Sequence, residues 1–384
     1  MTADLKIIDL KAYPTSFPVP PENRVALGIG TAIKRDAVVV KVTTAGGLVG
    51  WGESHHGRAH TAVAKLIETT LKQLVLGMDA GDVVGVWKKI YDKQLASHGM
   101  GAGTCLAMSG IDCALWDIRG QAAGMPLYKM LGGQRKAVPA YAGGVSLGFQ
   151  DPAKLIEELE PSLKQGYKAV KLRVGDTPKR DLERIRAVRK HVGDAIEILT
   201  DANIGYTVAD VRKVLPGMDE MGVAWLEEPF PAHDYRSYQI AAGLGCRTPL
   251  AAGENHYTRY EFNRVLEDGS ITILQPDLSK TGGITEAMRI AHMASAYKLP
   301  IHPHSSMTGL NHAASIHFLA AIDNGGYFEG DVSKANKFRD ELCSRPYEVD
   351  ADGNVWPLHK PGLGLEVNEE FLLKHPPIEG PGYI

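Results

Sequence analysis

The sequence has few cysteines, no long apolar run and almost no net charge. Only four of its 384 residues are cysteine, and no two are close in the sequence, so neither a disulfide framework nor a zinc-cysteine site is expected: Cys105, Cys113, Cys246 and Cys343. No stretch approaches the ~18 consecutive apolar residues of a membrane span. With 42 Lys and Arg against 45 Asp and Glu, and no basic block, nothing favours nucleic acid or an anionic membrane as a partner. We therefore expect a cytoplasmic globular protein with a small-molecule ligand.

Residues 1–130 predict an α+β unit. Three β-rich segments (5–13, 37–43 and 48–52) are followed by three segments with helical periodicity (61–75, 82–95 and 104–123). A Pro- and Gly-rich loop, residues 17–30, lies between the first two β-rich segments. We interpret this unit as a cap on a larger domain.

Residues 131–350 alternate short β-branched runs with helical stretches, which is typical of parallel βα units. After a first run at residues 138–143, seven runs end at intervals of 23 to 28 residues, close to the length of one βα unit. Eight such units predict an α/β fold of the (β/α)₈, TIM-barrel type. Residues 351–384 are rich in Pro and Gly, contain no βα unit and are expected to pack back on the cap. The ionisable residues that end the seven runs are Arg173, Asp201, Glu227, Glu254, Asp277, His304 and Glu329.

The ionisable residues at the ends of these runs indicate a metal site, because active sites of such barrels lie at the carboxyl ends of the strands. Asp201, Glu227 and Glu254 end three successive runs, so their carboxylates can converge on one point. An all-oxygen ligand set favours Mg²⁺, or else Mn²⁺, over zinc. Three carboxylates and a dication leave one negative charge, so an anionic substrate would need cations nearby. The candidates are Lys171, Arg173 and Lys280.

Asp277 and His304 end neighbouring runs and are expected to meet at the mouth of the barrel. A carboxylate beside an imidazole raises its basicity and fixes its tautomer, which suits a general base. The alternative is a zinc site made by His302 and His304, since alternate residues of a strand point the same way. The acidic trio needs no histidine, which disfavours that alternative.

Several motifs together carry a resemblance to a known family. They are Lys171-Leu172-Arg173, Asp201-Ala202-Asn203, Trp225 to Pro229 (WLEEP), Gly253-Glu254-Asn255, Asp277 with Lys280 to Gly283, and Pro303-His304-Ser305. This set resembles the mandelate racemase subgroup of the enolase superfamily. The segment from Asp112 to Asp117, with Pro126 and residues 131–133, is similar to the helix that joins the family's cap to its barrel.

The resemblance implies a modified (β/α)₈ barrel with an α+β cap, and a base that forms an enediolate with the help of Mg²⁺. By this likeness the trio supplies the Mg²⁺ ligands, and Asp277 with His304 forms the dyad of one catalytic face. Glu329 would hydrogen-bond the substrate carboxylate, which requires it to be protonated or strongly perturbed, and Lys171 would help to neutralise that carboxylate. A homo-oligomer, dimer or octamer, is also implied.

Arg173 departs from the racemases of the subgroup, which carry a second lysine there as the base on the face opposite the histidine. Arginine is a poor base because it stays protonated. Inversion needs proton transfer on both faces, whereas dehydration needs one base and an acid for the leaving hydroxide. We therefore favour dehydration of a polyhydroxy acid to a 2-keto-3-deoxy acid. A racemase or epimerase using Lys171 as second base, and a non-catalytic ligand-binding relative, are the alternatives.

The substrate is expected to be a small carboxylate. In the family two cap loops select it, and here these resemble residues 17–30 and 53–60. The second loop carries His55, His56 and Arg58, which suits a polyhydroxy or dicarboxylic acid better than an aromatic one. The expected substrate-binding residues are His55, Arg58, Asn203 and Lys280.

Overall fold

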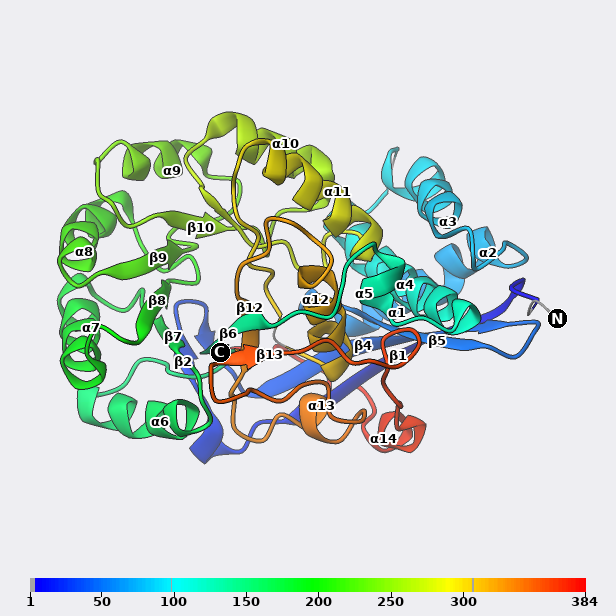
Figure 1. The fold of residues 1–384 in the computed structure, drawn as a ribbon, viewed down its shortest axis with the longest axis horizontal. Coiled ribbons are helices and arrows are strands. Elements are labelled where there is room, and N and C mark those ends of the chain that lie inside the picture. Colours follow the sequence, from blue (N-terminus) through cyan, green and yellow to red (C-terminus); the bar gives the residue numbers. More distant parts are fainter. Residues whose placement is uncertain (1–3, 98, 306) are drawn as a thin grey trace.

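The cap is an antiparallel sheet covered by helices. This computed structural model describes residues 4–97, 99–305 and 307–384. β1 (Ile7–Pro18), β4 (Lys34–Thr44) and β5 (Val49–Ser54) form the sheet. Helices α1 (His60–Leu66) and the long α4 (Ala102–Ala123) pack on it, and α3 (Val83–Ile90) packs on α4, at the right of Figure 1. The three β-rich and three helical segments expected here are all present.

Seven parallel strands curl into the barrel within the described residues (Figure 1), in the order β11-β10-β9-β8-β7-β6-β12. Helices follow them on the outside, from α6 (Pro152–Lys164) to α12 (Gly309–Leu319). The strands are β6 (Val138–Gly143), β7 (Ala169–Arg173), β8 (Glu197–Asp201), β9 (Val223–Glu227), β10 (Leu250–Ala252), β11 (Ile273–Leu274) and β12 (Phe328–Asp331). The helices between the first and last are α7 (Pro178–Val192), α8 (Val208–Glu220), α9 (Tyr235–Ala242), α10 (Thr258–Asp268) and α11 (Gly283–Ala296).

The seventh run, expected at residues 299–304, is wrong as a full strand. Only Ile301 pairs, with Leu274 on one side and Gly325 on the other, which closes the gap between β11 and β12. The runs expected to end at Glu254 and Asp277 also stop early, at Ala252 and Leu274. The Asp277 carbonyl accepts from Lys280 and Thr281 in a turn, so it is not available for ladder pairing. These residues therefore reach the site from loops.

Side-chain alternation along the strands points the site residues into the barrel. In β7, Val170 and Leu172 pack outward against the helices, whereas Ala169 faces an inner cluster with Trp225 and Tyr141. Lys171 and Arg173 share the inward face with Ala169 and lie nearer the carboxyl end. The inner cluster thus fills the barrel below the charged residues.

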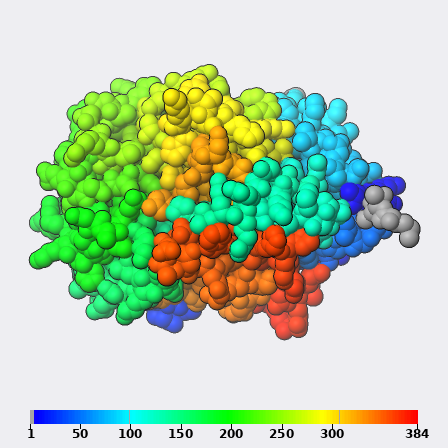
Figure 2. Space-filling view, in the orientation of Figure 1, coloured from blue at the N-terminus to red at the C-terminus, as the bar shows by residue number. Residues whose placement is uncertain are grey.

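The tail contacts both parts of the molecule. β13 (Asn354–Val355) pairs antiparallel with β6, and the carbonyl of His375 accepts from Thr15 and Ser16 in the cap. In Figure 2 the orange and red surface of this tail runs across the face between barrel and cap. None of the helices within the described ranges is both long and apolar enough to cross a bilayer.

Candidate active site

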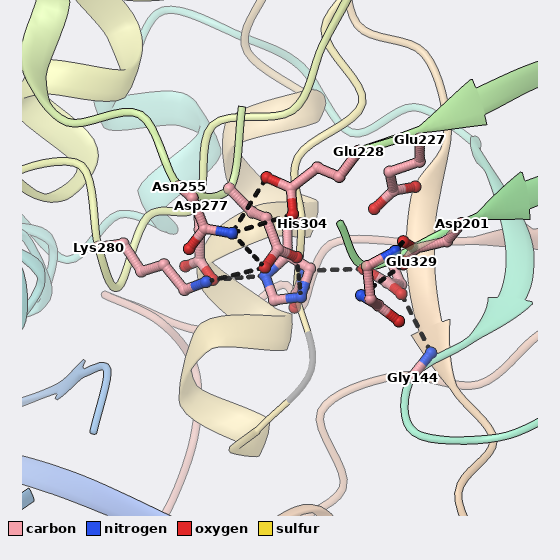
Figure 3. Close-up of polar contacts among 12 residues, drawn as sticks. Gly144, Asp201, Glu227, Glu228, Asn255, Asp277, Lys280, His304 and Glu329 are labelled. Carbon is pink, nitrogen blue, oxygen red and sulfur yellow. Dashed lines mark hydrogen bonds and ion pairs between the residues drawn. The ribbon is translucent and has the colours of Figure 1, made fainter. Parts of the chain in front are cut away.

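The predicted site residues gather at the carboxyl ends of the barrel strands (Figure 3). Register aligns Arg173 with Asp201, and Asp201 with Glu227, across β7, β8 and β9. Arg173, Asp201 and Glu227 are nearly inaccessible to solvent; the side chain of Glu254 is 14% exposed, more than these residues. Buried charges at this density require partners.

Lys171 lies between three carboxylates. Its Nζ is 3.0 Å from Glu227 Oε1, 3.0 Å from Glu329 Oε1 and 3.5 Å from Asp201 Oδ2. Burial lowers the pKa of Lys171, but these acids outweigh it and hold the pKa well above its usual value. The ammonium is therefore a fixed positive charge in this arrangement.

Glu329 is held by the loops on either side of it. Its carboxylate accepts from the backbone N–H of Gly144 at 3.0 Å and of Ser305 at 3.1 Å. Burial raises the pKa of Glu329, but Lys171, His304 and Arg173 together lower it to about 2. This direction favours the ionised acid, whereas a hydrogen bond from Glu329 to a substrate carboxylate would need the protonated form.

Arg173 is bound on three sides. Its guanidinium pairs with Asp201, donates to Asn203 Oδ1 at 3.1 Å and contacts the carbonyl of Gly144. Burial lowers the pKa of Arg173, but Asp201 leads the acids that raise it above its already high value. This side of the site carries a cation that does not release a proton.

The Asp277–His304 dyad is formed as expected. His304 Nδ1 lies 2.6 Å from Asp277 Oδ2, and its Nε2 lies 2.9 Å from Glu254 Oε2. The other oxygen of Asp277 accepts from the N–H and hydroxyl of Ser279 and from Asn311 Nδ2. Burial lowers the pKa of His304, but Glu254 and Asp277 outweigh it and raise the pKa well above the usual value. The fixed Nδ1 leaves Nε2 as the atom that faces the site.

The zinc alternative has no support in this geometry. His302 Nδ1 accepts from the N–H of Tyr327 at 2.9 Å, and the His302 ring packs edge-on against Trp225, 4.9 Å between centroids. His304 instead faces Asp277 and Glu254. The two rings diverge because the chain leaves the sheet after Ile301.

The acidic trio fits a divalent cation by its chemistry. As the side chains stand in residues 4–97, 99–305 and 307–384, no three His, Cys, Asp or Glu are grouped as metal ligands. The reason is that each acid of the trio faces a basic group instead. Asp201 and Glu227 nonetheless converge on one cation, the Lys171 ammonium, while Glu254 is turned to Lys280, 3.2 Å away, and His304. Buried oxygen ligands around a shared positive charge suit Mg²⁺ or Mn²⁺.

A cavity of about 450 Å³ opens beside these groups. Arg173, Asn203, Glu254, Lys280 and His304 line its floor, and the loop of His55 to Arg58 lines its wall. All four residues expected to bind substrate (His55, Arg58, Asn203 and Lys280) therefore border one cavity. The volume suits a small, polar acid.

His55 and His56 present neutral donors to this cavity. Each Nδ1 accepts a backbone N–H, from Gly57 at 3.1 Å and from Arg58 at 2.9 Å, which places the remaining proton on Nε2. Burial lowers the pKa of His56 to about 3 and that of His55 well below its usual value. Neutral N–H donors suit substrate hydroxyl groups.

Sequence reasoning missed several residues that line the cavity. Glu228 and Asn255 belong to the quoted motifs, and Asn255 Nδ2 donates to Glu228 and, at 3.1 Å, to Glu254, which orients that acid. His56 was counted among the polar residues of its loop but was not named as a substrate-binding residue. Tyr383 had no signal, because it lies in the Pro- and Gly-rich tail.

Comparison with known families agrees with the fold. A family model described as mandelate racemase / muconate lactonizing enzyme, N-terminal domain, matches residues 14–132, and one described as enolase C-terminal domain-like matches residues 154–371. The chain belongs to the mandelate racemase/muconate lactonizing enzyme family of the enolase superfamily. The expected family and the modified TIM-barrel fold are thereby confirmed.

Individual relatives span nearly the whole chain. A solved member of the enolase superfamily from Polaromonas sp. JS666 is 53% identical, with a TM-score of 0.96, and the match covers 99% of this chain and 100% of the other. A racemase from Streptomyces coelicolor A3(2), solved with bound magnesium, is 28% identical, with a TM-score of 0.87 and 96% and 99% coverage. An arabinonate dehydratase from Saccharolobus solfataricus is 32% identical over 94% of this chain and 97% of its own.

Further relatives are named D-galactonate dehydratase and D-galactarolactone cycloisomerase. The chain is thus an enzyme of the dehydratase or racemase/isomerase kind, as expected. Which reaction it performs, on which acid and with which metal, is a separate question.

Proposed function

We propose that this enzyme dehydrates a polyhydroxy acid to a 2-keto-3-deoxy acid with Mg²⁺ as its cofactor. The observation that carries the proposal is the asymmetry of the site. The His304–Asp277 dyad stands on one side, and on the other Arg173 is fixed against Asp201 and Asn203. One base and one permanent cation suit elimination better than inversion.

With Glu254 turned to a metal ion instead of His304, the imidazole would be free to take the α-proton at Nε2, because Asp277 occupies Nδ1. Removal of this proton places a second negative charge on the substrate carboxylate. Lys171 and Arg173 lie where they would stabilise that charge. A Mg²⁺ held by Asp201, Glu227 and Glu254 would supply Lewis-acid stabilisation of the same carboxylate.

Loss of the β-hydroxyl completes the elimination. The imidazolium of His304 carries the abstracted proton and can return it to the departing hydroxide, which leaves as water. The resulting enol ketonises with a proton at C3 to give the 2-keto-3-deoxy acid. Substrate hydroxyls would bind the neutral N–H groups of His55 and His56, with Lys280 and Asn203 beside them.

The racemase alternative requires a second base, and the candidate is Lys171. Its Nζ is engaged by Glu227 and Glu329 at 3.0 Å each, so it would have to break these contacts and lose a proton among carboxylates. This geometry disfavours it. Several relatives are named dehydratases of sugar acids, which supports the elimination.

Incubation in D₂O followed by NMR separates the two reactions. A 2-hydroxy acid without a β-hydroxyl should exchange its α-hydrogen in one configuration only, with slow or absent inversion. A suitable polyhydroxy acid should give 2-keto acid with deuterium at C3. Equal exchange of both enantiomers, with the deuterated antipode accumulating, would show a working base on the Arg173 side and overturn the dehydratase assignment.

A further inference from the structure

The tail adds a strand to the cap loop that covers the cavity. β2 (Ala26–Leu27) and β3 (Gly30–Thr31) form a small hairpin. The N–H of Thr31 donates to the Ile384 carbonyl at 2.7 Å, and the N–H of Ile384 donates back at 3.1 Å. In Figure 1 the C-terminal end lies beside β2. Two-residue strands are marginal alone, so this pairing supports the hairpin. We call β2, β3 and residues 382–384 together the lid sheet.

Two glycines show how closely the lid sheet is fitted. Gly30 has a φ of +107°, and a Cβ there would lie 2.8 Å from the Ile384 carbonyl oxygen. A Cβ on Gly28 would lie 2.2 Å from the carbonyl oxygen of Ala202, the residue after Asp201. Larger side chains would push the hairpin away from the tail or from the turn beside the metal site. The β2–β3 hairpin is thus closely packed between the end of the tail and the turn that follows Asp201.

Tyr383 projects from the lid sheet into the wall of the cavity. Its ring packs with Leu27, Ile29 and Val145, and all four residues line the cavity. The guanidinium carbon of Arg58 lies 5.0 Å from the centre of the Tyr383 ring. A cation at this distance over an aromatic ring is attracted to it and loses freedom.

Arg58 is a positively charged residue in this wall of the cavity. Arg173 and Lys280, which line the floor, are paired with Asp201 and Glu254. For Arg58 the contacts within the described residues are the Tyr383 ring and a backbone bond from its N–H to His56. The exposed side chain of Arg58 lines the cavity, and no acidic side chain within the described residues pairs with it.

We propose that Tyr383 is a specificity-determining residue that holds Arg58 over the cavity to bind a second carboxylate at the far end of the substrate. The inference rests on the proposed function and deepens it, because it assigns the substrate to the polyhydroxy dicarboxylic acids. One carboxylate lies at the metal site, the hydroxyls lie along His55 and His56, and the other carboxylate meets Arg58. The tail, which carries no part of the chemistry, selects the acid.

The test compares six-carbon sugar diacids with the matching monoacids, with MgCl₂ present and 2-keto acid formation as readout. The diacid should be the better substrate of the wild type. Tyr383→Ala should raise KM for the diacid about fivefold and change kcat little, because it frees the guanidinium without touching the dyad. Tyr383→Phe keeps the ring and should behave like the wild type. Tyr297→Ala, which removes an exposed tyrosine outside the cavity, is the matched control.

A double-mutant cycle tests whether Tyr383 acts through Arg58. Arg58→Ala should remove the preference for diacids, and adding Tyr383→Ala should then raise KM no further. Equal KM values for wild type and Tyr383→Ala, or a diacid preference that Arg58→Ala leaves unchanged, would overturn the proposal.

Binding measured without turnover separates this inference from the proposed reaction. Thermal stabilisation by each acid with MgCl₂ should be greater for diacids in the wild type and weaker in Tyr383→Ala. Acids that bind in this pattern but give no keto acid would overturn the dehydratase assignment and support the role proposed for Tyr383 and Arg58. Keto acid formation that Tyr383→Ala does not affect would support the dehydratase assignment and overturn the role of Tyr383. If no diacid is either bound or turned over, the inference is overturned.

Discussion

Arg173 pairs with Asp201, so a cation that cannot act as a base occupies the side of the site opposite His304. Asp201, the partner of this arginine, is also a proposed metal ligand. The charge of Arg173 therefore favours an anionic substrate and opposes a metal ion, two effects with opposite signs that substitution can separate.

Arg173→Gln should strengthen Mg²⁺ binding and weaken substrate binding. Loss of one positive charge next to Asp201 lowers the potential at the trio, which we expect to tighten Mg²⁺ roughly tenfold. KM for the acid should rise because the carboxylate loses a cation. Calorimetric titration with MgCl₂ and steady-state kinetics measure the two effects. Arg173→Lys keeps the charge and is the control; an unchanged Mg²⁺ affinity in Arg173→Gln would contradict the prediction.

Chelation should abolish activity, and Mg²⁺ or Mn²⁺ should restore it, because the proposed ligands are all carboxylates. Asp201→Asn and Glu227→Gln should weaken metal binding. Asp181→Asn is a matched control, since Asp181 is also a buried acid but pairs with Arg184 and does not line the cavity. Stoichiometric zinc that survives purification, together with unaffected metal binding by Asp201→Asn, would count against the site.

His304→Asn and Asp277→Asn should each lower turnover at least about a hundredfold, the lower range for loss of a general base. The fold and the metal content should be retained. Asn311→Ala removes one of three donors to Asp277 Oδ1 and should have a smaller effect. Rates close to the wild type in His304→Asn, measured on a verified substrate, would exclude the dyad from the mechanism.

Asp112 should make stability depend on pH where α4 meets α11. Its Oδ2 accepts from the N–H of Thr285 at 2.9 Å, and burial raises the pKa of this acid from 3.8 to about 7. The folded state therefore holds the proton more tightly than the unfolded state. The stabilisation is complete below about pH 4 and is lost as the pH rises through about 7. Asp112→Asn should flatten this part of the curve in chemical unfolding; a parallel curve would contradict the assignment.

Much of the barrel was predictable because its strands are buried and evenly spaced. β6, β7 and β9 begin and end at the predicted residues. β10, β11 and the Ile301 pairing are shorter than their β-branched runs. Periodicity indicates which residues are buried. It does not indicate where backbone hydrogen bonds between strands give way to those of a turn, as happens at Asp277.

The site residues that end a predicted strand could be identified from the sequence. The partners of those residues could not, because spacing does not reveal that Lys171 lies among three acids or that Asn255 links Glu228 to Glu254. Tyr383 could not be found at all. Its place depends on pairing between Thr31 and Ile384, which are 353 positions apart and share no local pattern.

The path of the tail also bears on how the molecule melts. β13 is part of the barrel sheet, His375 is bonded to β1 of the cap, and Ile384 is bonded to β3. Separation of cap from barrel would therefore break the tail's bonds either to the barrel sheet or to the cap. We expect calorimetry to record a single heat-absorption peak, with cap and barrel unfolding as one cooperative unit, and two resolved peaks would show that the tail does not couple them.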